Sequence, residues 1–128
     1  DNFIIFNPDT IWSNDYKNEI LKMEEIYFLR NLENILLLVN KNLSFDKNLK
    51  GDFNLSNNII SKKDKLDFIY IGCQIINKKI LISQNLKKFS ILNIWNKLID
   101  NKKLFGLESK KKFYHLTDLN TFNKLKDL

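Results

Sequence analysis

The sequence contains no alanine, one arginine, one proline, one histidine and three glycines. A single cysteine, Cys73, excludes an internal disulfide. Its apolar neighbours in IYIGCQII indicate a small buried side chain, with a catalytic thiol as the less favoured alternative. No apolar run approaches the ~18 residues that cross a bilayer, and no signal-peptide pattern opens the chain. These absences favour a soluble, cytoplasmic protein without a membrane partner.

The size of the chain limits how many cores it can form. Its 128 residues are 44% hydrophobic, which is enough for one globular core and short for two. We therefore expect residues 1–128 to form a single domain segment.

The positive charge of the chain invites a nucleic-acid interpretation. The net charge is +6, but Arg30 is the only arginine among 21 basic residues. Asn, Lys, Ile and Phe abound, and these residues are encoded by A/T-rich codons. The lysines are scattered, and their densest run, Ser109 to Lys112, is short. A nucleic-acid surface usually concentrates its charge and uses arginine for bidentate contacts. A basic α/β module that binds RNA or DNA is therefore the least favoured hypothesis, and no nucleic-acid partner is expected.

Hydrophobic periodicity predicts alternating strands and helices, which is typical of an α/β sheet. The expected elements are a buried strand at 3–6, a helix at 15–30 capped by Asn14 or Asp15, a buried strand at 34–40, a short strand at 51–55, a strand at 67–72 continued by apolar residues around a turn at 77–79, a helix after Ser90, a hairpin of 103–109 and 112–116, and a last helix from Thr117 or Asp118 to Leu128.

The order of several short motifs resembles a known family. NPDTIW, ILLLV, GDFNL, FIYIGCQII, FSILNIWNKLIDNKKLFGLES and KFYHLTDLNTF follow one another along the chain. This series resembles the C-terminal part of bacterial sugar-1-phosphate nucleotidylyltransferases. It is most similar to the branch that acts on N-acetylmuramate 1-phosphate or mannose 1-phosphate.

The resemblance implies an incomplete Rossmann-like nucleotidyltransferase fold, with a mixed, mostly parallel sheet flanked by helices. The glycine-rich nucleotide loop of the family would precede Asp1, so the N-terminal nucleotide-binding unit is expected to be missing. Residues 1–128 would then be a fragment, the C-terminal portion of a nucleotidyltransferase domain. We expect this segment alone to be inactive and to expose an uncovered sheet edge.

The resemblance also implies a reaction in nucleotide-sugar biosynthesis. A sugar 1-phosphate attacks the α-phosphorus of a nucleoside triphosphate, giving an NDP-sugar and pyrophosphate. The family neutralises the phosphates with Mg²⁺, and Mn²⁺ can substitute. The resemblance leaves the nucleobase, the sugar and the oligomeric state undetermined.

The resemblance also implies site residues, which we assign to this chain by their positions in the matching motifs. Asp9 matches the first metal-binding aspartate of the family and is the expected catalytic residue, although an aspartate after Pro8 can equally cap a turn. Asn7, Gly51 and Gly72 are expected to contact the substrate. Asp52 and Gln74 fit the pattern without an assigned role.

Three positions depart from the family pattern. His115 stands where the second metal-binding aspartate is expected, and imidazole is a poor ligand for Mg²⁺. Either another carboxylate such as Asp118 serves, or another metal binds, or activity has been lost; a core histidine is a further alternative. Thr117, followed by Asp118, stands where the family has a Gly-Thr pair, and Ile71 replaces a threonine of the family. These changes favour the second hypothesis, a degenerate, non-catalytic relative that binds a sugar phosphate.

Overall fold

The computed structural model of the chain describes residues 1–82, 91–116, 123, 124 and 126. The described strands form one sheet of six, in the order β1-β5-β2-β6-β4-β3. The strands are β1 (Asn2–Phe6), β2 (Asn34–Asn40), β3 (Asn54–Ser56), β4 (Ile59–Ser61), β5 (Phe68–Asn77) and β6 (Phe105–Ser109). The helices are the 3-10 turns η1 (Asn14–Tyr16) and η2 (Lys41–Leu43) and the α-helices α1 (Lys17–Leu29), α2 (Lys78–Ile82) and α3 (Ile91–Asp100).

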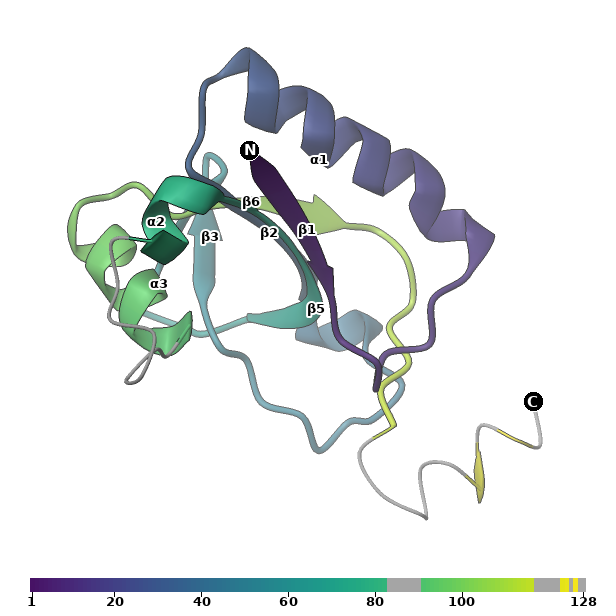
Figure 1. Cartoon of the computed structure of the whole chain (residues 1–128). Helices are drawn as coiled ribbons and strands as arrows, with labels where there is room; N and C mark the ends of the chain where they lie inside the picture. Colours follow the sequence, from purple (N-terminus) through teal and green to yellow (C-terminus); the bar gives the residue numbers. More distant parts are fainter. Residues whose placement is uncertain (83–90, 117–122, 125, 127–128) are drawn as a thin grey trace.

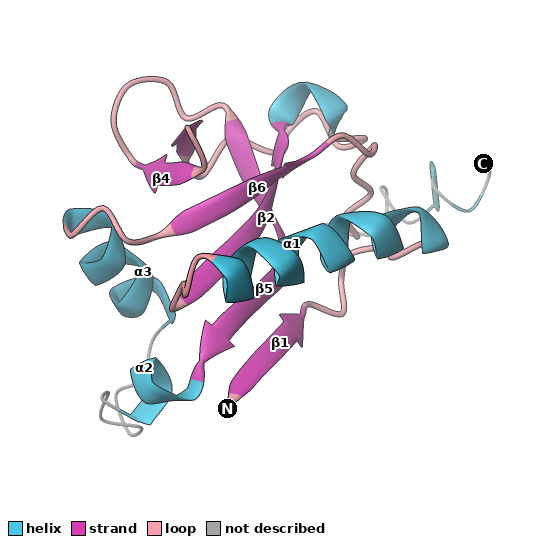
Figure 2. Cartoon of the chain, turned by 90° about the horizontal axis from the view of Figure 1, so that it is seen from above, coloured by secondary structure: helices cyan, strands magenta, loops and turns pink. Residues whose placement is uncertain are grey.

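Helices lie against both faces of the sheet. Figure 1 shows α1 on one side and the pair α2 and α3 on the other. From above, α1 crosses the strands at the centre of the sheet (Figure 2). The helix has this position because Met23 and Tyr27, one turn apart, are both buried on its sheet-facing side. The predicted α/β class and helix-flanked mixed sheet are confirmed.

The expectation of mostly parallel pairing is wrong for neighbouring strands. Among the described pairs of strands, only β2 and β6 are parallel, and β5 runs antiparallel to both β1 and β2. The physical reason is that β5 lies between β1 and β2. These two strands therefore run in the same direction, together with β6, without being neighbours. Their carboxyl ends meet at one edge of the sheet.

Strand β1 was expected to be buried, but most of its residues are exposed. It is an edge strand whose described partner is β5. Phe3, Ile4 and Phe6 remain 46%, 41% and 46% exposed. An apolar run of four residues does not reveal whether a strand lies at the centre or the edge of a sheet, since both pair through the same backbone groups.

Strand β2 is the buried centre that its sequence predicts. All residues from Asn34 to Val39 are buried, and β2 pairs with β5 on one side and β6 on the other. Alternate residues face opposite layers of the protein. Ile35, Leu37 and Val39 contribute to the cluster beneath α1, and Leu36 and Leu38 to the cluster against α3.

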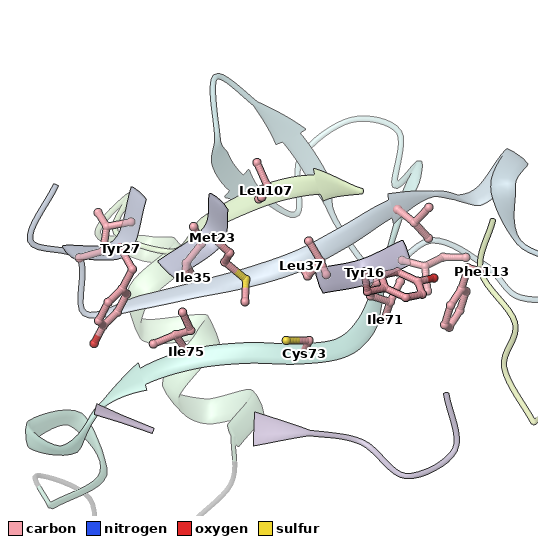
Figure 3. Close-up of a cluster of buried hydrophobic side chains, with 13 residues drawn as sticks. Tyr16, Met23, Tyr27, Ile35, Leu37, Ile71, Cys73, Ile75, Leu107 and Phe113 are labelled. Atoms are coloured by element: carbon pink, nitrogen blue, oxygen red, sulfur yellow. The ribbon is translucent and has the colours of Figure 1, made fainter. Parts of the chain in front are cut away.

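The cluster beneath α1 includes the only cysteine of the chain (Figure 3). Cys73 is fully buried between β5 neighbours Ile71 and Ile75, and burial raises the pKa of its thiol to about 12. The prediction of a buried, apolar cysteine is confirmed. A thiol that stays protonated near neutral pH is a poor nucleophile.

Several other elements differ from those that the sequence predicts. The turn expected at 77–79 is the start of α2, which begins at Lys78 directly after β5. The short strand expected at 51–55 is shifted to β3, and β4 follows it. Neither Asn14 nor Asp15 caps the first helical segment, which starts after Ser13. The Ser90 cap, Asp118 and the last helix from 117 to 128 lie outside the described residues, apart from positions 123, 124 and 126.

The predicted hairpin of 103–109 and 112–116 is wrong. Strand β6 pairs with β2 and β4, while the segment after the lysine run forms isolated bridges to Ser44 and Thr10. The lysines remain exposed, and Phe113 is buried among the residues beneath α1. Burial of Phe113 directs this segment away from β6. Within the described ranges, no helix combines the length and apolar character that a membrane span requires.

Candidate functional site

A fixed turn follows β1 and carries Asn7 and Asp9. The backbone N–H of Asn7 donates to the carbonyl of Gly72 at 2.7 Å. The indole N–H of Trp12 donates to the carbonyl of Asn7 at 3.0 Å, and the Trp12 ring packs edge-on against Phe6. Pro8 limits the backbone between these two anchors. The turn is therefore held at both its start and its end.

Thr10 is a site residue that sequence reasoning missed. Its hydroxyl donates to the carbonyl of Ile71 at 2.7 Å, and the residue is only 5% exposed. This bond fixes the residue after Asp9 against β5. A threonine directly after the aspartate of a turn was the available signal, because a buried hydroxyl requires a partner.

Gly72 is required by an internal contact. Its φ angle is +93°, and a β-carbon placed there would lie 2.7 Å from the β-carbon of Asn7. The glycine therefore makes room for the Asn7 side chain. The structure brings these two predicted substrate residues together. Their contact with a sugar phosphate remains a prediction.

His115 lies beside the same turn. The backbone N–H of Ile11 donates to the backbone carbonyl of Tyr114 at 3.0 Å. The backbone N–H of Leu116 donates to the backbone carbonyl of Asp9 at 2.8 Å. These bonds flank an antiparallel bridge between Thr10 and His115. Asp9 and His115, distant in sequence, are therefore neighbours in the fold.

The side chains of these two residues meet. The Nε2 atom of His115 lies 3.0 Å from Oδ2 of Asp9, and their side chains are 24% and 50% exposed. The pair lies just beyond the carboxyl end of β1, at the edge where β2 and β6 also end. In open α/β sheets this edge is the usual place for ligands.

The segment that carries His115 also connects two strand ends. The backbone N–H of Phe45 donates to the backbone carbonyl of Phe113 at 2.8 Å. The backbone N–H of Phe113 donates to the backbone carbonyl of Leu43, also at 2.8 Å. Residues 113–116 therefore lie between the segment after β1 and the segment after β2. This placement fixes His115 from both sides.

Gly51 lies beside the segment that leads into β5. Its α-carbon faces the backbone carbonyl of Leu66, which leaves no space for a side chain. Gly51 also lines an open groove of about 740 Å³ with Lys41, Lys47 and Lys50. None of Asn7, Asp9, Gly72 and His115 lines this groove. The groove that Gly51 lines is therefore separate from the contacts that join Asn7, Asp9, Gly72 and His115.

The two residues without an assigned role both have structural partners. Oδ2 of Asp52 accepts the backbone N–H of Tyr70 at 3.0 Å, and burial raises the pKa of this carboxyl group while that hydrogen bond opposes the shift. Oε1 of Gln74 accepts the indole N–H of Trp95 at 3.3 Å inside the core. Both interactions join β5 to its surroundings.

The donor set of the site limits which metal it can hold. Among the described residues, no group of three or more His, Cys, Asp and Glu side chains is placed to bind a metal ion. The pair Asp9 and His115 supplies one carboxylate and one imidazole. Mg²⁺ prefers oxygen ligands in octahedral geometry, so this pair does not fit Mg²⁺ well.

The fold has clear relatives among solved structures. Over 99% of this chain, it matches a protein assigned as a glucose-1-phosphate thymidylyltransferase from Bacillus anthracis, solved in complex with sucrose, with a TM-score of 0.71 and 16% identity. It also matches HddC from Yersinia pseudotuberculosis over 96% of the chain, with a TM-score of 0.65 and 21% identity. No protein-family model and no curated protein sequence matches the chain.

These matches extend over part of each relative. The chain spans 54% of the first structure and 53% of the second, which is about half of their length. At such low identity the likeness concerns the fold and not the substrate. The chain therefore shares the mixed α/β fold of about half of each of these two structures, as the motif order predicts.

Proposed function

We propose that a protein containing this chain transfers a nucleotidyl group from a nucleoside triphosphate to a sugar 1-phosphate. A phosphate oxygen of the sugar 1-phosphate forms a bond to the α-phosphorus. The bond from that phosphorus to the β-phosphate breaks, and pyrophosphate leaves. The products are an NDP-sugar and pyrophosphate. The solved relatives support the nucleotidyltransferase part of this proposal through their fold.

The observation that carries the proposal is the meeting of Asp9 and His115. Both positions were selected from motif matches at opposite ends of the chain, and their side chains lie 3.0 Å apart. Two positions chosen at random along the chain would rarely be in contact at one edge of the sheet. We therefore assign this edge as the reaction site.

The residues of this chain act mainly by positioning. Hydrogen bonds from Asn7 and Thr10 to β5 hold the turn of Asp9 in one conformation. A fixed turn reduces the entropy cost of aligning two reacting phosphates. No step is assigned to Mg²⁺, because one imidazole and one carboxylate are an unsuitable donor set for that ion. We propose that the reaction takes place in the cytoplasm, where we expect both substrates.

A second candidate function is non-catalytic binding of a sugar phosphate. The specific observation that favours it is the contact between His115 and Asp9. In this contact an imidazole stands where the family resemblance leads us to expect a second metal-binding aspartate. A relative without catalysis would keep the fold and the sugar contacts. It would lose the charge neutralisation that joining two polyanions requires.

Pyrophosphate release tests the proposal. The substrates are a panel of nucleoside triphosphates and sugar 1-phosphates with Mg²⁺ and then Mn²⁺. The protein is the 128-residue chain alone and, separately, the full product of the reading frame that encodes it. We expect turnover from the full product, its loss in Asp9→Ala, and no turnover from the 128 residues alone. Asp100→Ala, which removes a carboxylate at the end of α3, is the matched control.

The result also separates the two candidate functions. A folded longer protein that binds a sugar 1-phosphate in a calorimetric titration but turns over no pair of substrates supports the non-catalytic relative. A protein that binds neither class of substrate contradicts both proposals. Micromolar binding of a nucleoside triphosphate to the 128 residues alone contradicts the expected dependence on a further nucleotide-binding segment.

A further inference from the structure

A groove between β4 and α3 has no part in the expected chemistry. Its volume is about 440 Å³, and residues 59–63, 99, 100 and 102 line it. We propose that this groove binds a small amphipathic anion, which is a molecule with an apolar body and one negatively charged group. The proposal does not rest on the proposed function, because neither Asp9 nor His115 lines the groove.

The groove lies at the opposite end of β6 from the pair of Asp9 and His115. Ile59 of β4 is paired with Phe105, the first residue of β6, and α3 ends at Asp100, shortly before β6 begins. Figure 2 shows β4 and α3 beside this same end of β6. A ligand in the groove would therefore leave the assigned reaction edge open.

Hydrogen bonds join the two walls of the groove. The backbone N–H of Ile60 in β4 donates to the carbonyl of Leu104 at 2.8 Å, directly after the turn that follows α3. Nζ of Lys62 donates to Oδ1 of Asn96 on α3 at 3.1 Å. The groove is therefore already formed without a ligand, and a preformed site loses little conformational entropy on binding.

Three isoleucines supply the apolar part of the lining. Ile60 is 1% exposed, whereas Ile59 and Ile99 are partly exposed. Ligand sites in proteins are usually concave and mostly apolar, with a few charged or polar groups that orient the ligand. The apolar body of a ligand would cover these side chains and remove their remaining surface from water.

The charged side chains of the lining favour an anion. They are three lysines, at positions 62, 63 and 102, and one aspartate, Asp100, which gives a net charge of +2. Within residues 1–82 and 91–116, no ion pair joins Lys63 or Lys102 to an acidic side chain. A cleft with one predominant sign of charge and low-dielectric walls concentrates ions of the opposite sign.

The test uses decanoate, which combines an alkyl chain with one carboxylate. Decyltrimethylammonium has the same chain and the opposite charge, and acetate has the same charge without the chain. Each compound is titrated into the isotope-labelled 128-residue chain, and binding is followed through the amide signals in NMR spectra. We expect decanoate to shift the signals of Ile59, Lys63, Ile99 and Lys102 saturably, and the other two compounds to bind at least about tenfold more weakly.

Charge variants at exposed positions of the groove test the contribution of each sign. We expect Lys63→Ala and Lys102→Ala each to weaken decanoate binding about two- to fivefold, as for other exposed charge pairs. Lys63→Glu combined with Lys102→Glu should weaken it about tenfold or more. Asp100→Asn removes the negative charge of the lining, so it should strengthen binding about twofold.

Lys17→Glu combined with Lys22→Glu is the matched control. These exposed lysines belong to α1, on the other face of the sheet, and their replacement changes the net charge by the same amount. We expect this control to bind decanoate like the original chain. A well-dispersed NMR spectrum of each variant verifies that the fold is retained.

Four outcomes would overturn the proposal. Equal binding of decanoate and decyltrimethylammonium would show apolar contact without charge selection, and equal binding of acetate would show attraction to lysines alone. Shifts confined to the exposed residues of β1 would place the alkyl chain elsewhere. Shifts of the groove signals on raising the protein concentration without decanoate would show that a second copy of the chain covers the groove. None of these results depends on pyrophosphate release.

Discussion

The side chain of Asn7 occupies the space where Gly72 would carry a β-carbon. A β-carbon at Gly72 would lie 2.7 Å from that of Asn7, and the φ angle of Gly72 is +93°. The turn after β1 therefore packs against Gly72 of β5 at a distance that only a glycine allows. The position of Asp9, two residues after Asn7, depends on this fit.

We predict that Gly72→Ala destabilises the protein by about 1–3 kcal/mol, the usual cost of a strained backbone conformation, with steric overlap adding to it. Gly106→Ala is the control, since the nearest atoms to its β-carbon would belong to the flexible side chains of Ile60 and Leu55, at about 3.0 Å, and its φ lies outside the left-handed region. Urea unfolding of both variants measures the difference.

A double variant separates the two causes. Asn7→Gly combined with Gly72→Ala removes the overlap with the Asn7 side chain and keeps the unfavourable φ angle. We expect it to recover part of the lost stability. Equal stability of Gly72→Ala and the original chain would show that the close approach of Asn7 does not constrain this turn.

The buried thiol of Cys73 predicts a loss of stability at alkaline pH. Burial raises its pKa from 9.0 to about 12, so the unfolded chain releases this proton at a lower pH than the folded chain. The associated stability is complete below pH 9 and falls as the pH rises toward 12. Tyr16 acts in the same direction, because burial raises its pKa to about 12.

Urea unfolding between pH 8 and pH 10.5 tests this dependence. We expect the free energy of unfolding to fall, with each fully released proton contributing up to ~1.4 kcal/mol per pH unit. Cys73→Ala should reduce the slope and leave the contribution of Tyr16. Rapid reaction of native Cys73 with a disulfide reagent at pH 8 would contradict the burial on which the prediction depends.

Glu19 connects α1 to the end of β6. One carboxylate oxygen accepts the hydroxyl of buried Ser109 at 2.6 Å, and the other accepts the backbone N–H of Lys110 at 2.9 Å. We predict that Glu19→Ala costs about 1–3 kcal/mol, because the partners lose a charged acceptor. Glu25→Ala, on an exposed position of α1, is the control.

Thermal unfolding of these two variants measures the contribution of Glu19. A melting temperature that falls for Glu19→Ala and stays constant for Glu25→Ala is the expected result. If both variants melt like the original chain, solvent replaces the carboxylate at Ser109 without cost.

The open edge of β1 predicts self-association of the 128-residue chain. Its described partner is β5 alone, and Phe3 and Ile4 are 46% and 41% exposed. An exposed apolar edge strand pairs readily with another chain. Sedimentation velocity at rising concentration should show oligomers, and Ile4→Lys should reduce them.

Leu29→Lys is the control for this experiment. Leu29 is 81% exposed at the end of α1, away from the strand edge. If Leu29→Lys reduces association as much as Ile4→Lys, general surface hydrophobicity is responsible instead of strand pairing. A monomeric original chain at high concentration contradicts the prediction.

The sequence predicted those elements whose pattern is local. The run NILLLVN gave β2 with the bounds Asn34–Asn40, because a continuous apolar run suits a strand buried on both faces. The apolar periodicity of 91–99 gave α3, whose Ile94, Trp95 and Leu98 are buried. The sequence also identified Asp9 and His115, through motif order instead of physical pattern.

Only the tertiary structure decided which segments pair. FIIF forms an exposed edge strand and KFYHL joins the turn after β1, since strand pairing depends on long-range backbone contacts that side-chain periodicity does not encode. The sequence by itself determined the chemical character of each segment, whereas packing determined that a carboxylate and an imidazole meet at one sheet edge.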